Sequence, residues 1–285
     1  MLASVMDTCL VCRMPDKRGC QPLCYSRREV MSLADIRQWY RTRGPLDSLR
    51  QWIAAIRSRV FRPGQGKHPF DRVHGVDTSG LLYANALATG HRNDVYSEGY
   101  YATAPSLFHG AMALWQKSLY SLTMADYTFV DLGCGKGRVL LMASDYPFSA
   151  IVGVELNAKL AAVARKNLTR WMRSPRACRT ASVVEGDVLE LPIPDGPVVM
   201  FLFNSFEMEM VRGLLERLVE ASRTRSAPID LVYIHPEHDN MVRQTAGVEK
   251  LADENIPFTA EDAAADAFGV NVDQCCAYRF AGRLQ

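Results

Sequence analysis

The sequence predicts an α/β protein built on a mostly parallel β-sheet with helices on both faces. From about residue 127 onward, short apolar runs alternate with longer segments of helical character. The runs are apolar at nearly every position, as expected for parallel strands that are buried on both sides. A glycine-rich turn separates the first run from the first helix, and sheets of this kind commonly bind a ligand at such a turn.

The chain before this region is predicted to divide into an extension and a helical segment. Residues 1–30 form an extension that contains four cysteines and need not fold. Residues 31–68 form a basic helical segment and linker, because apolar residues recur there at helical spacing before the turn-rich sequence RPGQGKHP. Residues 69–285 then form the main domain.

The main domain is predicted to contain strands and helices in regular alternation. The expected strands are residues 127–132, 150–156, 181–187, 198–204, 229–236 and 275–280. The expected helices run from the glycine turn to about residue 144, over 158–171 and over 208–223. Cys275 and Cys276 fall in the last strand, where we expect them to be core thiols.

Composition and length indicate a globular protein with a substantial core. The chain has 285 residues, of which 48% are hydrophobic and 22% are charged, as is usual for soluble domains. No apolar run approaches the roughly 20 residues of a membrane span, and the N-terminus is a poor secretory signal. We therefore expect no membrane span and a cytoplasmic location.

The charge is spread unevenly along the chain. Residues 1–62 carry 12 Lys and Arg against 5 Asp and Glu, whereas the remainder carries 21 against 26. The N-terminal segment is thus a basic arm on a mildly acidic body. Such an arm either meets an anionic partner or forms an ordinary solvated helix face.

Four of the eight cysteines lie close together near the N-terminus, at Cys9, Cys12, Cys20 and Cys24. The first two have the C-x2-C spacing of a zinc knuckle. The seven-residue gap between the pairs is short for a zinc ribbon, and few apolar residues surround the cluster. Zinc binding is therefore the less favoured interpretation.

The glycine turn lies in the sequence FVDLGCGKGRVLLMA, residues 129–143, and contains Gly133, Gly135 and Gly137. A dinucleotide prefers the spacing G-x-G-x-x-G, whereas the spacing here is G-x-G-x-G. Asp131 stands two residues before the first glycine, where it would repel a pyrophosphate but suit a cationic amino-acid ligand. S-adenosylmethionine, which carries an ammonium and a sulfonium and no phosphate, fits this pattern better than NAD.

Two further acids follow the next two strands. Glu155 lies 24 residues after Asp131, where a strand-end acid can accept from both ribose hydroxyls. Asp187 follows the third strand, where an acid can accept from an adenine amino group. Ligands of such sheets bind at the carboxyl ends of the strands, and all three acids are predicted there.

Residues 125–205 resemble the class I S-adenosylmethionine-dependent methyltransferases. VDLGCGKG resembles the first motif of that superfamily, GVEL the second, EGDVLELP the third and FLFNSF the fourth. The resemblance implies a Rossmann-like sheet of seven strands. More narrowly, HGVDTSG and YYATAPSLF together with these motifs are similar to a bacterial branch that resembles the Dot1-type lysine methyltransferases.

The resemblance also implies roles for individual residues. Asp131 with the backbone of Gly133 and Gly135 would hold the methionine part of S-adenosylmethionine, and Glu155 would hold the ribose. Asp187 and Val188 would hold the adenine. Gly137 completes the set of cofactor-binding residues that we predict.

The methyl acceptor is expected at the ends of the fourth and fifth strands. Asn204, followed by Phe206, stands where nucleic-acid amine methyltransferases have a motif with two prolines, and both prolines are missing here. His235 follows the fifth strand and is a credible base because it titrates near neutral pH. The segment that contains Tyr100 and Tyr101, before the first strand, could fold over this space as a lid. His235, His238 and Asp239 could instead bind a metal, which we disfavour.

We predict a methyltransferase that acts on an amine of a protein or on a small molecule. Nucleic acid is left open as a partner but is not favoured, because the prolines are absent. The alternative is a protein that binds S-adenosylmethionine without turnover and docks nucleic acid or another partner through its basic arm. A nicotinamide oxidoreductase is disfavoured by Asp131 and the glycine spacing.

Overall fold

The computed structural model of the chain describes residues 67–96 and 99–280. The predicted extension, almost all of the basic helical segment and the four N-terminal cysteines lie outside the described residues. The division into residues 1–30, 31–68 and 69–285 therefore stays a prediction. The described helices include none with the length and apolar character needed to cross a bilayer.

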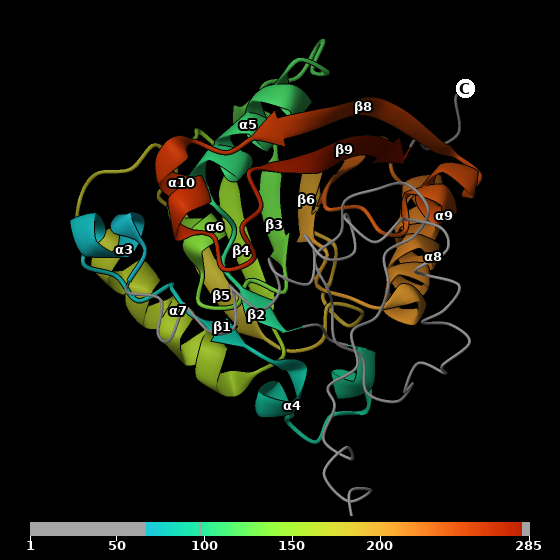
Figure 1. Ribbon diagram of the computed structural model, residues 1–285. Helices are drawn as coiled ribbons and strands as arrows, with labels where there is room; N and C mark the ends of the chain where they lie inside the picture. Colours follow the sequence, from blue (N-terminus) through green and yellow to red (C-terminus); the bar gives the residue numbers. More distant parts are fainter. Residues whose placement is uncertain (1–66, 97–98, 281–285) are drawn as a thin grey trace, which may run out of the picture. The chain divides into compact units, whose positions relative to one another are not determined.

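A seven-stranded sheet forms the centre of the domain (Figure 1). Its strands are β3 (Thr128–Leu132), β4 (Ala150–Glu155), β5 (Ala181–Glu185), β6 (Val198–Phe203), β7 (Ile229–Ile234), β8 (Val248–Pro257) and β9 (Val272–Phe280). They lie in the order β5-β4-β3-β6-β7-β9-β8. The first five are parallel, and β9 pairs antiparallel with both β7 and β8. The predicted Rossmann-like, mostly parallel sheet is confirmed.

Helices cover both faces of this sheet, as predicted. One face packs against α5 (Pro105–Gln116), α6 (Arg138–Ala143) and α7 (Ala158–Trp171). The other face packs against α8 (Met208–Thr224) and α9 (Asp239–Gln244). Cys275 belongs to the first core and Cys276 to the second, and both are fully buried. They are core thiols, as the alternation of side chains along β9 requires.

The strands and helices follow from local sequence. β6 is buried at five of its six positions, which matches its unbroken apolar sequence VVMFLF. α7 is preceded by Asn157, whose side-chain oxygen accepts from the backbone of Lys159 and Leu160. This is a standard N-cap interaction. The carboxyl ends of the parallel strands and the first residues of the helices that follow them lie at one edge of the sheet, where Figure 1 shows the connecting loops.

The segment before the sheet forms a cap, which we define as residues 69–103. It contains α3 (Pro69–His74), β1 (Leu81–Leu82), α4 (Ala84–Leu87), the 3-10 helix η1 (Arg92–Tyr96) and β2 (Tyr100–Tyr101). β1 and β2 pair as a small antiparallel sheet. A second 3-10 helix, η2 (Met124–Asp126), precedes β3, and α10 (Ala260–Ala265) connects β8 to β9.

A buried ion pair attaches the cap to the sheet domain. Arg138, at the start of α6, lies 3.6 Å from the carboxylate of Asp71 in α3, and both side chains are almost fully buried. The guanidinium also donates to the hydroxyl of Thr78 at 2.7 Å and to the carbonyl of Thr103. Removing one partner of such a pair typically costs about 3–5 kcal/mol, so the cap is an integral part of the fold.

Candidate active site

The predicted site residues gather at the carboxyl edge of the parallel strands. The chain leaves β3 toward β4 and β5 and then returns to β6 on the other side of β3. This reversal is the topological switch point at which such sheets bind ligands. Asp131, Glu155 and Asp187 lie at or just after the ends of β3, β4 and β5, and all three are buried.

The three glycines of the turn after β3 all have a positive φ, of 78° at Gly133, 54° at Gly135 and 85° at Gly137. A Cβ on Gly135 would lie 2.2 Å from the ring of Tyr100 in the cap, and one on Gly137 would lie 3.1 Å from Ala164 in α7. The bare backbone is therefore required by protein packing as well as by its conformation.

Gly133 faces the fourth strand rather than the cap. A Cβ at this position would lie 3.2 Å from Ser205 and 3.6 Å from Phe206. The turn after β6 thus lies directly beside the first glycine. This contact brings the predicted acceptor turn and the predicted cofactor turn together across the switch point.

The carboxylate of Asp131 has no hydrogen-bond partner among the described residues, although the residue is only 4% exposed. Burial and the neighbouring Glu155 raise the pKa of Asp131 well above its ordinary value. Glu155 differs, because its two oxygens accept from the backbone of Gly135 and Asn157 at 2.8 Å each. Burial still raises the pKa of Glu155 overall, against the lowering effect of these bonds.

These two acids test whether the predicted cofactor fits. A buried carboxylate whose pKa is raised by burial and by a neighbouring carboxylate favours a cation beside it. The ammonium of S-adenosylmethionine would supply the partner that Asp131 lacks. The two carboxylates at the ends of β3 and β4 therefore suit this cofactor.

Asp187 is held by the cap, which the sequence did not indicate. Its Oδ2 accepts from the side-chain amide of Asn93 at 2.5 Å, and its Oδ1 accepts from the backbone of Leu189 at 2.9 Å. Val188, the second predicted adenine contact, is 6% exposed. Asn93 belongs to η1, so the cap reaches the end of β5 at the place predicted for the adenine.

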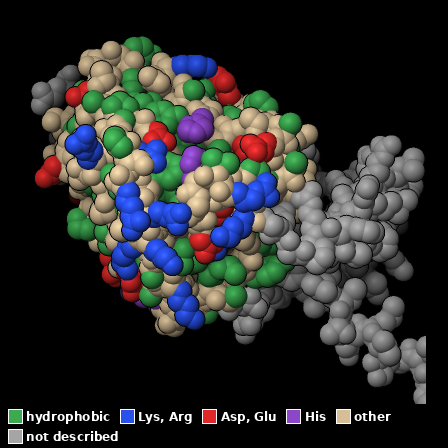
Figure 2. Space-filling view, turned by 90° about the vertical axis from the view of Figure 1, so that its left-hand side faces the viewer, with side chains coloured by type: hydrophobic (Ala, Val, Ile, Leu, Met, Phe, Trp, Pro, Cys, Tyr) green, Lys and Arg blue, Asp and Glu red, His purple; other side chains and the backbone are tan. Residues whose placement is uncertain are grey.

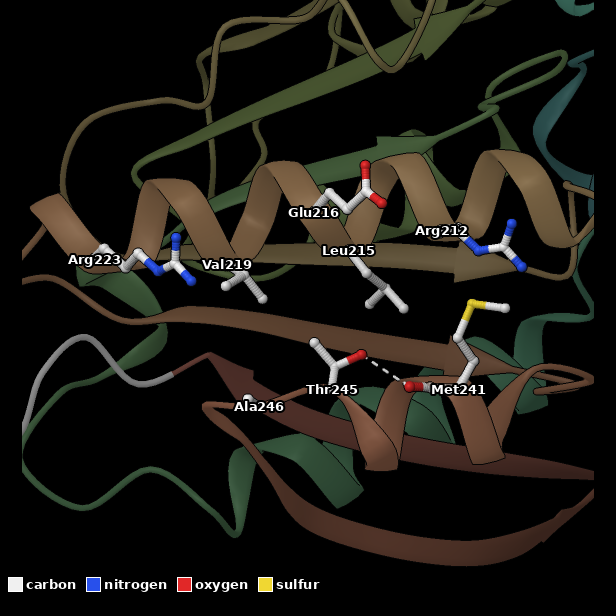
Figure 3. Close-up of a pocket in the computed structure, with 8 residues that line it drawn as sticks. All are labelled: Arg212, Leu215, Glu216, Val219, Arg223, Met241, Thr245 and Ala246. Carbon is white, nitrogen blue, oxygen red and sulfur yellow. Dashed lines mark hydrogen bonds between the residues drawn. The ribbon is translucent and has the colours of Figure 1, made fainter.

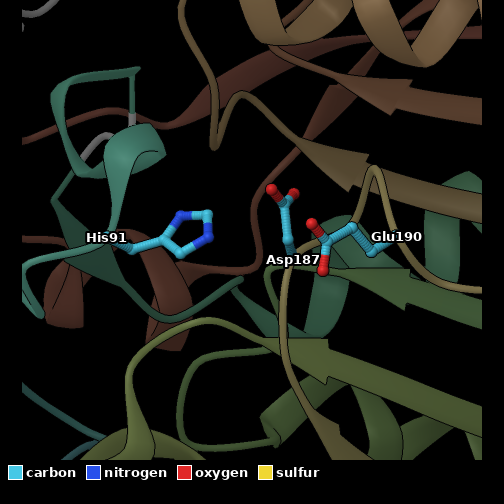
Figure 4. Close-up of side chains that lie close together, drawn as sticks. All are labelled: His91, Asp187 and Glu190. Atoms are coloured by element: carbon cyan, nitrogen blue, oxygen red, sulfur yellow. The ribbon is translucent and has the colours of Figure 1, made fainter.

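His91, Asp187 and Glu190 form the one grouping of metal-ligand type among the described residues (Figure 4). One potential ligand atom from each lies within 4.8 Å of the others. Protein contacts already occupy part of this set. Asn93 donates to Asp187, and Arg92 lies 3.6 Å from Glu190. The contacts of Asp187 and Glu190 are thus explained without an ion.

Asn204 and His235 are the two non-glycine residues with positive φ in the described part of the chain, at 32° and 51°. They follow Phe203 and Ile234, which are paired across β6 and β7. The two residues therefore stand side by side at the ends of neighbouring strands. Such backbone conformations cost about 1–3 kcal/mol each and are concentrated at functional sites.

The ring of His235 is oriented by Asp273 of β9. Its Nδ1 lies 2.9 Å from the carboxylate Oδ1, and its Nε2 lies 3.9 Å from Glu237. Burial lowers the pKa of His235, but the hydrogen bond and charge of Asp273 and the charge of Glu237 outweigh it, so the pKa is raised. The Nδ1 contact leaves Nε2 as the nitrogen directed away from Asp273.

The predicted metal alternative at His235, His238 and Asp239 is not supported by the contacts. Asp239 is engaged by Tyr278 and by Lys250, whose ammonium lies 3.0 Å away. His235 is engaged by Asp273. These three residues do not form a grouping of ligand type in the described structure.

Tyr100 and Tyr101, the segment predicted as a lid, contact different parts of the domain. Tyr100 packs against Gly135, and its hydroxyl donates to the carbonyl of Thr78 at 2.5 Å. Tyr101 donates to Asp266, after α10, at 2.7 Å. The cap therefore covers the glycine turn with Tyr100, whereas Tyr101 links β2 to the connection between β8 and β9.

Two shallow depressions lie on the opposite face of the sheet, where α8 and α9 pack. The one in Figure 3 has a volume of about 280 Å³ and lies between the side chains of Leu215 and Val219 on α8 and Met241 and Thr245 near α9. The other, of about 460 Å³, is lined by residues such as Met208 and His238. Neither of these two depressions is lined by a predicted cofactor residue.

Residues 129–225 match a family model described as a methyltransferase domain. No curated protein matches the chain. Similar solved structures include an RNA methyltransferase from Salinibacter ruber with bound S-adenosyl-L-homocysteine, 17% identical over 65% of this chain and 96% of that chain, with a TM-score of 0.41. The cyclase SpnF is 12% identical over 82% of this chain and 96% of that chain, with a TM-score of 0.45.

Proposed function

We propose that this chain, of which residues 129–225 match a methyltransferase domain, is a class I S-adenosylmethionine-dependent methyltransferase that transfers the methyl group to an amine of a protein or to a small molecule. The acceptor would lie at the ends of β6 and β7. The observation that carries this proposal is the pair Asn204 and His235, which stand side by side with strained backbone conformations. Strain of this kind persists where the surrounding structure holds a side chain in a required direction.

In this proposal, the cofactor is held by the other half of the sheet edge. Asp131 would bind its ammonium, Glu155 its ribose hydroxyls, and Asp187 with Val188 its adenine, while the three glycines shape the turn. The cap residue Asn93 supports Asp187 through its amide. The methyltransferase unit would then include the cap and extend over residues 69–285.

The cofactor supplies a methyl group that its sulfonium already activates, so the protein mainly aligns the acceptor and excludes water. The Oδ1 of Asn204, which already accepts from the hydroxyl of Tyr233 at 3.3 Å, would also accept an N–H of the acceptor amine. His235 would accept the departing proton at Nε2, since its Nδ1 faces Asp273. Asp273 is a positioning residue, and Tyr101 would hold the cap against the connection that contains α10.

The pH dependence of transfer tests the role of His235. A base must be neutral, so transfer from labelled S-adenosylmethionine into fractionated cell extract should rise as pH rises through the raised pKa of His235. Asp273→Asn removes the charge that raises this pKa, so the rise should move to lower pH. His235→Gln should lose about 100-fold or more in transfer.

The matched control is Asp253→Asn, in the neighbouring strand β8, which should leave the pH profile in place. Circular dichroism and cofactor affinity would establish that each variant is folded. A His235→Gln protein with full turnover would overturn the acid–base role. A profile that Asp273→Asn leaves unmoved would overturn the positioning role.

A further inference from the structure

The exposed side of α7 carries a row of positive charge that the proposed reaction does not use. Residues 156–184 contain no Asp or Glu but seven Lys and Arg. These are Lys159, Arg165, Lys166, Arg170, Arg173, Arg176 and Arg179. Figure 2 shows Lys and Arg side chains gathered on this face of the molecule, the left-hand side of Figure 1, where α3 and α7 lie.

The spacing places four of these residues in one row. Lys159, Lys166 and Arg170 are separated by seven and four residues, which keeps their side chains on the same side of α7, and Arg173 follows in the turn just after the helix ends at Trp171. With a rise of about 1.5 Å per residue, Lys159 and Arg170 lie about 16 Å apart along the axis. All four are exposed, so they form a narrow cationic stripe, which we call the α7 stripe.

The positive charge of the α7 stripe is not balanced by carboxylates in the described part of the chain. Of the seven cations, Arg165 and Arg176 have an ion-pair partner among the described residues, Glu185 at 3.2 Å and Asp145 at 3.0 Å. The four residues of the stripe have no carboxylate partner in that part of the chain. The guanidinium of Arg170 lies against Gly75 at the end of α3, which holds it in place beside the helix.

We propose that the α7 stripe binds the phosphodiester backbone of a nucleic acid. Arginine supplies five of the seven cations, and its planar fork suits phosphate oxygens. A membrane surface fits less well, because α7 offers no apolar anchor: Leu168 and Trp171 are buried, at 7% and 4% exposed. Interfacial helices instead insert an exposed apolar face.

The position of the α7 stripe connects it to the active edge. α7 starts three residues after Glu155, and the backbone of its N-cap, Asn157, donates to that carboxylate. Lys159 is therefore within one helical turn of the proposed ribose contact. A polyanion along the stripe would lead from the outer surface to the edge that holds the cofactor. This inference does not depend on the identity of the methyl acceptor.

The test compares two triple variants of the full chain with equal change in charge. The stripe variant is Lys166→Gln, Arg170→Gln and Arg173→Gln. The control variant on the other face is Arg212→Gln, Arg223→Gln and Arg243→Gln, which are also exposed. Binding to fluorescent 20-nucleotide RNA and DNA, single-stranded and duplex, is measured by anisotropy over a series of salt concentrations.

At about 0.1 M salt, the stripe variant should bind about 50-fold more weakly than the unchanged protein, and the control within about threefold. The slope of log affinity against log salt should fall by about two to three for the stripe variant. The comparison of RNA with DNA identifies which of the two polymers the α7 stripe binds. Cofactor affinity should be equal in both variants, which checks that each one is folded.

Three results would overturn the proposal. The first is an equal loss of binding in the two variants, since the charge would then act without regard to position. The second is no binding of the unchanged protein to either polymer. The third is binding of phosphatidylglycerol vesicles or polyglutamate that depends on the stripe, while binding of nucleic acid does not.

Discussion

The two halves of the proposed active edge are built in different ways. On the proposed cofactor side, positive φ angles belong to the glycines of the turn after β3, and Glu155 is fixed by two backbone amides. On the proposed acceptor side, positive φ angles belong to Asn204 and His235. The first half relies on the main chain, and the second relies on two side chains that a strained backbone carries.

This difference explains which half is recognisable in the sequence. A backbone that must bend without a Cβ requires glycine, so a few residue types recur at fixed spacing. Strained non-glycine residues follow no such rule, because the surrounding structure decides which side chain is held. Substitutions on the proposed cofactor side should therefore lower the affinity for the cofactor, whereas substitutions on the proposed acceptor side should lower turnover.

The largest expected effect is on folding at the glycine turn. Gly135→Ala would bring a Cβ to 2.2 Å from Tyr100 at a φ of 54°, and should lower the free energy of unfolding by about 3 kcal/mol. Gly196→Ala is the matched control, with a φ of 73° and open space around it. It should cost about 1 kcal/mol. Urea denaturation measures both, and equal losses would show that crowding by Tyr100 is unimportant.

The next largest effect concerns turnover on the acceptor side. Asn204→Gly removes the amide but tolerates the positive φ, so it should lower transfer about 100-fold through lost alignment. Cofactor affinity should stay within about threefold. Transfer into the active extract fraction and calorimetry with S-adenosylmethionine measure the two quantities. Full turnover would mean that Asn204 serves only the turn.

A smaller effect is expected for ribose binding. Glu155→Gln keeps one acceptor oxygen but loses the charge, and charged hydrogen bonds are worth about 1.5–3 kcal/mol. Cofactor affinity should fall at least about tenfold. Glu185→Gln is the matched control, because Glu185 pairs with Glu155 in the β4–β5 register but is exposed. Equal affinities for the two variants would contradict the ribose assignment.

The smallest effect is a pH dependence of cofactor binding. The pKa of Asp131 is raised in the free protein, and an ammonium ligand would lower it, so binding should release protons. Affinity should then rise with pH, by at most about tenfold per unit, until it passes the raised pKa. Calorimetry in buffers of different ionisation enthalpy measures the release.

The same carboxylate affects stability with the opposite sign. Because the folded pKa of Asp131 lies above the unfolded value, the free protein should lose stability as pH rises between the two. Saturating cofactor should remove that loss. Asp131→Asn should abolish both dependences, and a variant that keeps them would place the titrating group elsewhere.

The regular core of the fold could be predicted because its strands are buried on both faces. The helix expected at 158–171 begins and ends where α7 does, and all six expected strands are present. β8 was missed, because VEKLADENIP reads as polar. β8 is an edge strand with a register irregularity between Lys250 and Ala252, so neighbouring elements cover only part of its surface.

The cap and its contacts could not be predicted from sequence alone. Asn93 meets Asp187 across 94 positions, and Asp273 meets His235 across 38. Such pairs are set by topology and leave no local pattern. HGVDTSG and YYATAPSLF did indicate that the preceding segment mattered, and Thr78 and Tyr100 from these stretches contact the glycine turn or α6.

The cap also has consequences for the timing of the reaction. Asn157 donates to Leu87, Asn93 to Asp187, and Glu207 to the carbonyl of Tyr96. These bonds attach the cap to the residues that follow β4, β5 and β6. We expect exchange of spent for fresh cofactor to wait for the cap to open, a step slower than diffusion.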